Sequence, residues 1–147
     1  MDETSRLEVI AIESPAEMQR AYAIRRRVFI EEQRVPEEIE MDADDLHAFH
    51  ALAIRDGGAV GCGRMVEHTP SEVKIGRMAV LRDFRNTGVG AHILRFLIDR
   101  ARMRGFRKAI LHAQLTAEGF YLKQGFIPVG GVFDEAGIAH RKMERHL

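Results

Sequence analysis

The sequence has 147 residues, 46% of them hydrophobic and 30% charged, and its formal net charge at pH 7 is zero. This composition is typical of a globular protein and excludes a wholly disordered chain, so we expect one domain spanning residues 1–147. No apolar run reaches the roughly 18 residues of a membrane-spanning helix, and there is no overall basic charge of the kind that binds nucleic acid. The first residues are acidic and precede no apolar core, which favours a cytoplasmic protein with no membrane or nucleic-acid partner.

The first predicted elements are a strand over residues 7–12 and a helix that begins at Pro15. Ser14 is a suitable N-cap for this helix, Pro15 fits its first position, and Glu17 completes a capping box. Apolar residues at spacings of three and four continue the helix until Val35 and Pro36 end it.

An acidic loop follows this helix. Eight carboxylates lie within residues 31–45, which predicts either a solvated surface or an acidic rim for a cationic ligand.

Three predicted strands come next, over residues 49–54, 59–67 and 72–81, and Gly57 and Gly58 supply the first hairpin turn. A helix over residues 89–104 has one clear apolar stripe and is stopped by Gly105. The remaining prediction is a strand over 109–113, a helix over 116–123, and strands over 126–132 and 138–143. The order of elements predicts an α/β fold with a mixed sheet and helices on both faces.

The only cysteine, Cys62, stands in a Gly-Cys-Gly context with no base nearby in sequence, so we interpret it as a small strand residue and not as a nucleophile. No metal site is predicted, because no His-Glu-x-x-His or paired-cysteine spacing occurs, and His47 and His50 would lie on opposite faces of a strand. There is also no Gly-x-Ser-x-Gly motif of a serine hydrolase.

The most informative motif is Arg-Asn-Thr-Gly-Val-Gly at residues 85–90, between a predicted strand and a predicted helix. A helix start has unpaired N–H groups and a partial positive charge, and Gly88 and Gly90 let ligand oxygens approach it. The motif therefore predicts a phosphate cradle, although such a turn also serves simply to join a strand to a helix. Neither the P-loop nor the Gly-x-Gly-x-x-Gly pattern is present.

Together with the strand before it, this hexamer resembles the pyrophosphate-binding motif of the GNAT superfamily of acetyl-CoA-dependent N-acyltransferases. A second segment, from Phe120 to Phe126, is similar to the Tyr-x-x-x-Gly-Phe signature of that family. Segments 28–36 and 135–140 resemble a small bacterial branch of it. The resemblance implies a central mixed sheet of six or seven strands flanked by helices.

The resemblance also implies roles for residues. The backbone of Met78, Ala79 and Val80 would hold the thioester and pantetheine of acetyl-CoA, and Tyr121 would protonate the departing thiolate. Without the resemblance, a tyrosine beside Phe120 on a short helix favours amphipathic packing with its hydroxyl at the surface. The pyrophosphate would bind at Arg85, Asn86, Thr87, Gly88, Val89 and Gly90.

The function implied by the resemblance is acetyl transfer from acetyl-CoA to a primary amine, on a small molecule or a peptide, by direct attack in a ternary complex. A homodimer is expected by the same analogy. Two alternatives remain: a non-catalytic acyl-CoA sensor or interaction module, and an enzyme similar to acyl-homoserine lactone synthases. The sequence does not identify the acceptor amine. It also does not show which acyl chain the protein prefers.

A base or a water relay is expected, because an amine of pKa about 10.4 is almost fully protonated near pH 7.4. His50, His112, Glu32 and Glu118 are candidates, and none is favoured by its sequence context. Gln114 stands where many GNAT proteins carry asparagine, so the role of that asparagine does not transfer directly.

Overall fold

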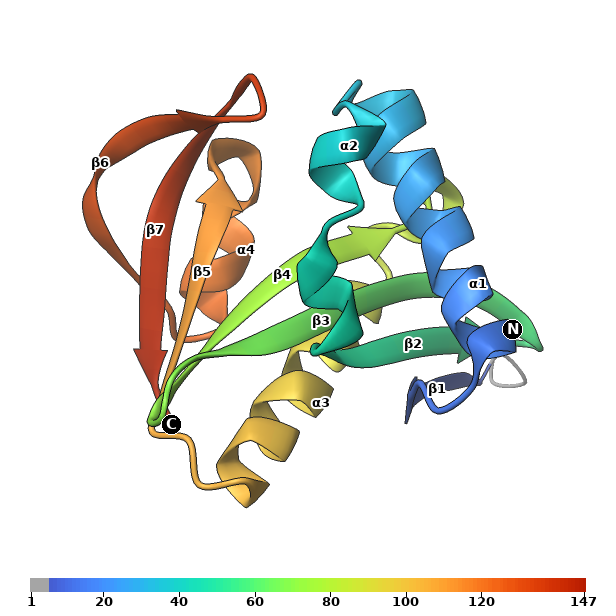
Figure 1. Ribbon diagram of the computed structural model, residues 1–147, viewed down its shortest axis with the longest axis horizontal. Helices are drawn as coiled ribbons and strands as arrows, with labels where there is room; N and C mark the ends of the chain where they lie inside the picture. The colour runs from blue at the N-terminus through green and yellow to red at the C-terminus, as the bar shows by residue number, and fades with distance from the viewer. Residues whose placement is uncertain (1–5) are drawn as a thin grey trace.

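The strands of the computed structural model, which describes residues 6–147, form one seven-stranded sheet in the order β1-β2-β3-β4-β5-β7-β6 (Figure 1). All neighbours are antiparallel except β4 and β5. The predicted mixed α/β sheet is thus confirmed. The strands are β1 (Leu7–Ala11), β2 (Phe49–Arg55), β3 (Gly58–Thr69), β4 (Glu72–Val80), β5 (Lys108–Gln114), β6 (Ile127–Glu135) and β7 (Ile138–His146).

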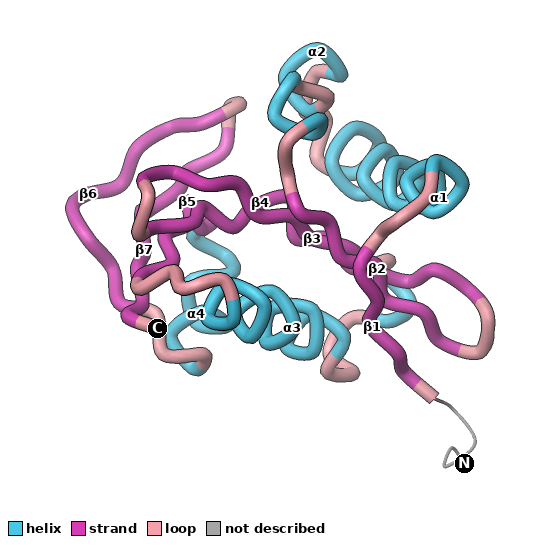
Figure 2. The backbone as a smooth tube through the Cα atoms, turned by 60° about the horizontal axis from the view of Figure 1, so that its bottom comes forward, coloured by secondary structure: helices cyan, strands magenta, loops and turns pink. Residues whose placement is uncertain are grey.

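Helices cover both faces of this sheet, as predicted (Figure 2). One face carries α1 and the short elements that follow it, and the other carries α3 and α4. None of the helices within residues 6–147 is long and apolar enough to cross a membrane. The helical elements are α1 (Pro15–Arg25), the π-helix η2 (Arg26–Glu32), α2 (Glu37–Glu40), α3 (Val89–Met103) and α4 (Glu118–Lys123), with 3-10 turns η3 (Ala43–Leu46), η4 (Arg82–Phe84) and η5 (Leu115–Ala117).

Helix α1 begins at Pro15 as predicted, because the Ser14 hydroxyl accepts a hydrogen bond from the Glu17 N–H at 3.1 Å. The predicted helical run does continue to Glu32, but it changes from α to π geometry after α1. The Gln33 N–H accordingly donates to the Val28 carbonyl, five residues earlier. π-helical turns are uncommon and occur often at functional sites. Nothing in the local sequence indicates this one.

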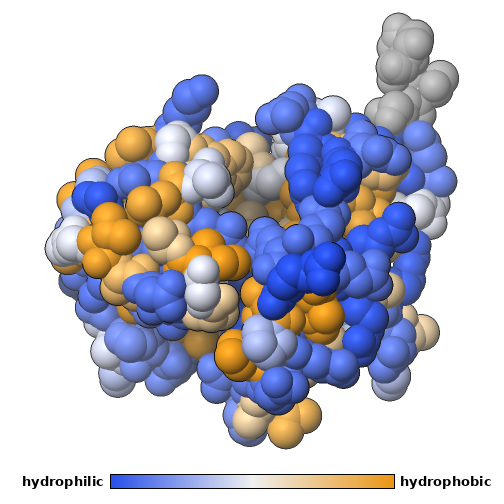
Figure 3. Space-filling view, turned by 90° about the horizontal axis from the view of Figure 1, so that it is seen from above, coloured by the Kyte–Doolittle hydropathy of each residue, from blue (hydrophilic) through white to orange (hydrophobic). Residues whose placement is uncertain are grey.

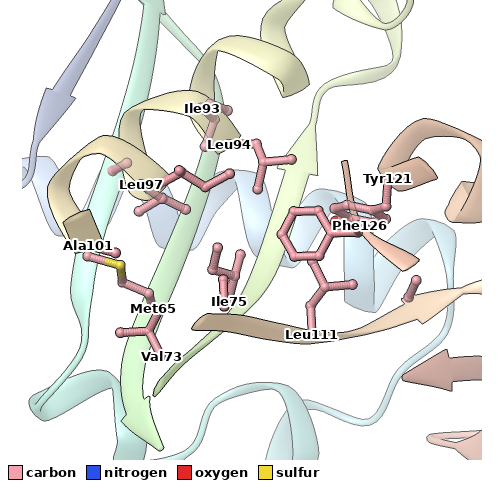
Figure 4. Close-up of a cluster of buried hydrophobic side chains, with 14 of the residues drawn as sticks. Met65, Val73, Ile75, Ile93, Leu94, Leu97, Ala101, Leu111, Tyr121 and Phe126 are labelled. Atoms are coloured by element: carbon pink, nitrogen blue, oxygen red, sulfur yellow. The ribbon is translucent and has the colours of Figure 1, made fainter. Parts of the chain in front are cut away.

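The apolar stripe predicted on α3 forms the larger core (Figure 4). Ile93, Leu94 and Leu97 are fully buried, and they pack over Ile75 of β4 and Leu111 of β5. A smaller core lies on the opposite face. Its buried members are Ala21, Ile24, Val28, Leu52, Cys62 and Ala79.

Some boundaries differ from the prediction. The acidic loop contains α2 and η3, and the predicted helix 116–123 is divided into η5 and α4. Strands β6 and β7 extend three residues beyond their predicted ends at 132 and 143. The reason is that β7 pairs with β5 on one side and β6 on the other, so ladder hydrogen bonds hold residues whose sequence shows no clear alternation.

The two halves of the molecule present different surfaces (Figure 3). Exposed apolar side chains gather on the side that carries β6, whereas polar side chains dominate over the α1 half. The exposed apolar residues of β6 are Ile127, Val129 and Val132.

Gly61 of β3 allows α3 to lie close to the sheet. A Cβ atom at Gly61 would lie 2.9 Å from Ile93 Cδ1 and 3.0 Å from both the Ala79 carbonyl oxygen and Val89 Cγ1. Backbone oxygens and β-branched side chains yield little, so the helix would have to move.

We therefore expect Gly61→Ala to lower the free energy of unfolding by about 1–3 kcal/mol, through overpacking. Urea denaturation followed by circular dichroism would measure this. Gly119→Ala is the matched control: nothing lies within 4 Å of its added Cβ, and it should be neutral or slightly stabilising. Equal stability of the two variants would contradict the close packing.

Candidate active site

Strands β4 and β5 separate part-way along their length. They pair only from Glu72 with Lys108 to Ile75 with Leu111. Beyond that point, residues 76–80 keep β3 as a neighbour on one side and have no strand partner on the other. A cleft of about 960 Å³ opens there. Its wall therefore includes a strand edge, which carries N–H and C=O groups available to a ligand.

A β-bulge shapes this strand edge. Cys62 pairs with Ala79 and Arg64 pairs with Gly76, so two residues of β4, Arg77 and Met78, lie opposite one residue of β3. Arg77 has a positive φ of 52°, which is uncommon for a residue with a side chain. The predicted thioester-binding residues Met78, Ala79 and Val80 follow directly, and all three line the cleft.

The Arg77 guanidinium anchors the bulge to the acidic segment. It donates to the carbonyls of Ile39 and Glu40, at 3.1 and 3.0 Å, and to Asp42 Oδ2 at 3.1 Å. Its Nε also lies 3.2 Å from Glu40 Oε2. The α2 segment is thereby fixed against β4 beside the cleft.

Two further arginines extend this ion-pair network. Arg25 lies 2.7 Å from Glu40 and 2.8 Å from Asp45, and Arg64 lies 2.7 Å from Asp42 and 2.8 Å from Asp45. Arg25 and Glu40 are only 1% and 2% exposed. Burial alone would raise the pKa of Asp45, but hydrogen bonds from Arg25 and Arg64 hold it below its usual range.

Three carboxylates of the predicted acidic loop, Glu40, Asp42 and Asp45, thus face inward onto arginines. Both predictions for this loop are therefore wrong for these three carboxylates: they do not form a fully solvated surface, and they are not directed at a cationic ligand. Arg64 and Arg77 each stand in a Gly-Arg-Met triplet, and the two triplets lie on the neighbouring strands β3 and β4.

The predicted phosphate cradle lies at the other end of β4, where α3 begins. Gly88 is the N-cap of α3 with a φ of 91°, and no side chain caps the first turn. The first bond of the helix runs from the His92 N–H to the Gly88 carbonyl. The N–H groups of Val89 and Gly90 therefore lack helical acceptors, and both residues line the cleft.

Side chains in the cradle are mostly engaged within the protein. Arg85 donates to the Val80 carbonyl at 2.8 Å and to Glu32 at 2.9 Å. The Thr87 hydroxyl donates to the Phe84 carbonyl at 2.6 Å, and Thr87 does not line the cleft. Asn86 lines it, with a φ of 62°. Main-chain amides are thus the donors that remain for an anion.

Tyr121 lies on α4, against the cleft, and is 8% exposed. Its ring packs edge-on to Phe120 and Phe126, with centroids 5.0 and 5.8 Å apart. Within residues 6–147 its hydroxyl has no hydrogen-bond partner, and burial raises the pKa of Tyr121 to about 12. Tyr121 thus packs within the larger core, beside Phe126 (Figure 4).

Comparison with known proteins decides the family. The Acetyltransferase (GNAT) domain profile matches residues 9–147. The chain belongs to the GNAT superfamily of acyltransferases.

Relatives and solved structures agree with this family membership. The uncharacterized N-acetyltransferase YjcF of Bacillus subtilis is 31% identical over 138 residues, covering 93% of this chain and 98% of YjcF. An acyl-CoA N-acyltransferase from Pseudomonas aeruginosa has a TM-score of 0.84 at 27% identity, covering 95% and 99% of the two chains. An aminoglycoside 6'-N-acetyltransferase complexed with coenzyme A shares the fold, with a TM-score of 0.78 at 13% identity over 95% and 96%.

The four base candidates of this GNAT protein differ in their surroundings. His50 Nε2 lies 3.0 Å from the Asp45 carbonyl oxygen, and burial lowers the pKa of His50. Glu32 is paired with Arg85, and Glu118 lies 3.6 Å from Arg141. Of the four, only His112 lines the cleft. Its Nδ1 lies 2.8 Å from Glu135 Oε1, a contact that no motif in the sequence indicates.

Gln114 also lies in the cleft, where it joins the two sides. Its Nε2 donates to Gln33 Oε1 at 2.8 Å, so the end of β5 contacts the residue that follows the π-helix. No sequence signal links these two residues, because 81 positions separate them.

Cys62 is buried among apolar side chains, which raises the pKa of its thiol to about 12. A thiol of that pKa supplies almost no thiolate at neutral pH, so Cys62 is not a nucleophile in this fold. The interpretation of Cys62 as a small strand residue is confirmed. Within residues 6–147 there is also no cluster of three metal-ligating side chains.

We expect Asp45→Asn to break the ion-pair network and lower the free energy of unfolding at pH 7 by about 3–5 kcal/mol, because two buried arginines lose a shared anion. The folded state holds the pKa of Asp45 down, so its contribution is complete above about pH 4 and is lost on further acidification. Denaturation curves from pH 7 to pH 3 would show wild type and variant converging.

Asp44→Asn is the matched control for this experiment. Asp44 is exposed, and its carboxylate forms no ion pair with any residue from 6 to 147. It should unfold with wild-type stability. If Asp44→Asn and Asp45→Asn have the same effect, the network does not stabilise the fold as described.

Proposed function

We propose that this GNAT enzyme transfers an acetyl group from acetyl-CoA to a primary amine by direct attack in a ternary complex. The observation that carries the proposal is the cleft, because one continuous wall joins the start of α3, the free edge of β4 and Tyr121. These three features match the three parts of the reaction, namely a diphosphate, a thioester and a departing sulfur. The proposed location is the cytoplasm, with which a single unpaired cysteine is compatible.

The diphosphate of acetyl-CoA would bind to the amides of Gly88, Val89 and Gly90. No acceptor among residues 6–147 takes a hydrogen bond from these N–H groups, and the dipole of the 15-residue α3 favours an anion at its start. Arg85 would contribute by fixing the loop, since its guanidinium already bonds Val80 and Glu32. The coenzyme A bound by the aminoglycoside acetyltransferase of the same fold supports this choice of co-substrate.

The thioester would lie along residues 78–80. Backbone N–H groups on this strand edge are suited to polarise the carbonyl and to stabilise the oxyanion that forms on attack. Arg85 occupies the Val80 carbonyl but not the Val80 N–H. Ala79 is paired with Cys62 of β3, so Met78 and the Val80 N–H would supply the free groups of this strand edge. The amine nitrogen forms a bond to the carbonyl carbon, and the C–S bond then breaks.

Tyr121 would donate its proton to the sulfur as this bond breaks. A phenol with a pKa near 12 is fully protonated at neutral pH, and its hydroxyl is not committed to another residue among those described.

The amine must itself lose a proton. Deprotonating a lysine-like amine near neutral pH costs about 4 kcal/mol, so a base in the cleft is required.

We expect wild-type protein to release coenzyme A thiol in the presence of acetyl-CoA and a suitable amine, and Tyr121→Phe to lower kcat by about 100-fold. The panel of amines includes polyamines, amino sugars, amino acids and lysine peptides. Thiol release is followed with a chromogenic reagent, and the acetylated product is identified by mass. Because Cys62 is buried, the folded protein itself contributes little signal.

Tyr22→Phe is the matched control, since Tyr22 is the only other tyrosine and lies on α1, outside the cleft. It should keep wild-type kcat. Calorimetry should give all three proteins the same Kd for acetyl-CoA, within about twofold. Binding without turnover on any amine would favour the sensor alternative, and turnover unchanged in Tyr121→Phe would remove Tyr121 from the mechanism.

A further inference from the structure

A histidine and a glutamate from different strands meet in the wall of the cleft. His112 lies on β5, one position beyond Leu111, where the pairing with β4 ends. Glu135 is the last residue of β6, and its Oε1 lies 2.8 Å from His112 Nδ1. Both residues line the cleft. The pair therefore stands at the point where β4 and β5 separate.

The strand register places both side chains of this pair on the same face of the sheet. His112 is opposite Lys142 of β7, Gln114 is opposite His140, and His140 is opposite Phe133 of β6. Directly opposed residues point to the same face, so these side chains form one layer with Glu135. The Phe133 ring meets the His112 ring edge-on, at 5.0 Å and 80°. The imidazole is thus held by a carboxylate and an aromatic ring.

This contact determines which ring nitrogen is free. The Glu135 carboxylate accepts a hydrogen bond, so Nδ1 carries the proton in the neutral ring and Nε2 carries the lone pair. No residue from 6 to 147 forms a hydrogen bond with Nε2. A neutral imidazole in this tautomer is ready to accept a proton at Nε2.

Other groups near the cleft are less suited to this task. His50 does not line the cleft, and Glu32 and Glu118 are paired with arginines. Glu40 does line it, but Oε2 contacts Arg25 and Arg77, and Oε1 is covered from solvent. Of the four base candidates, only His112 lines the cleft, and its Nε2 has no hydrogen-bond partner within residues 6–147. His140 also lines the cleft, but it is only 7% exposed.

We infer that His112 is the general base of the acetyl transfer and that Glu135 is its positioning residue. The inference rests on the proposed function. Nε2 takes a proton from the amine while the nitrogen bonds to the thioester carbon, and Tyr121 gives its proton to the sulfur that leaves. One proton is accepted and one donated in each turnover, and solvent restores both residues.

Three charged side chains share a face of the sheet with His112. They are Glu135 of β6, Lys142 of β7 and Lys74 of β4. His140 is the other titratable ring of this layer, and its Nδ1 lies 2.7 Å from the Ile138 carbonyl oxygen. The pH profile of the variants must therefore be compared with that of wild type.

The test uses His112→Asn, which keeps an N–H for Glu135 but has no basic nitrogen, together with Glu135→Gln. We expect His112→Asn to lower kcat by about 100-fold or more and to abolish the acid limb of the pH profile of kcat/KM. Glu135→Gln should cause a smaller loss. The double variant should be no slower than His112→Asn, because Glu135 acts through His112. Calorimetry should show an unchanged Kd for acetyl-CoA.

His68→Asn is the matched control, since His68 lies exposed on β3 and outside the cleft, and it should keep wild-type kcat. A wild-type rate or a persisting acid limb in His112→Asn would overturn the inference while leaving acetyl transfer established. A measurement that needs no turnover is ¹⁵N NMR of the imidazole at neutral to mildly basic pH. We expect the Nδ1–H tautomer of His112, and the Nε2–H tautomer would overturn the proposed base.

Discussion

The loss of pairing between β4 and β5 after Ile75 and Leu111 determines the shape of this protein's cleft. A parallel pair that continued would use the backbone groups of residues 76–80 within the sheet and leave no room for a ligand. Because the strands separate, that edge of β4 becomes a wall with free hydrogen-bonding groups. Buried side chains on both faces, from α1 and from α3, keep β4 in place although one neighbour is missing.

The Arg77 bulge and the ion-pair network explain how this separation is maintained. Arg77 bends β4 at the point of divergence, and its side chain is held by the carbonyls of Ile39 and Glu40. Buried charges are costly unless paired, so the network is favourable only while its arginines and carboxylates remain together. The acidic segment therefore has a structural role in this enzyme: it fixes one side of the cleft to the sheet.

Local signals in the sequence predicted most of the fold. The N-cap at Ser14, the apolar stripe of α3 and the glycine turn at Gly88 each depend on neighbouring residues, and all three occur as expected. Features that depend on distant residues were not predictable. The inward pairing of Asp45 requires the positions of Arg25 and Arg64, and the contact of His112 with Glu135 requires the register of β5, β6 and β7. The assignment of residues 78–80 and 85–90 to acetyl-CoA remains a prediction.

The most direct measurement of the central claim is a titration of ¹⁵N-labelled protein with coenzyme A, followed through backbone amide shifts. If free main-chain amides at the start of α3 and along the open edge of β4 bind the cofactor, the largest shifts will belong to Gly88, Val89 and Gly90 and to Met78 and Val80. Largest shifts elsewhere, or no shifts at saturating coenzyme A, would contradict the account.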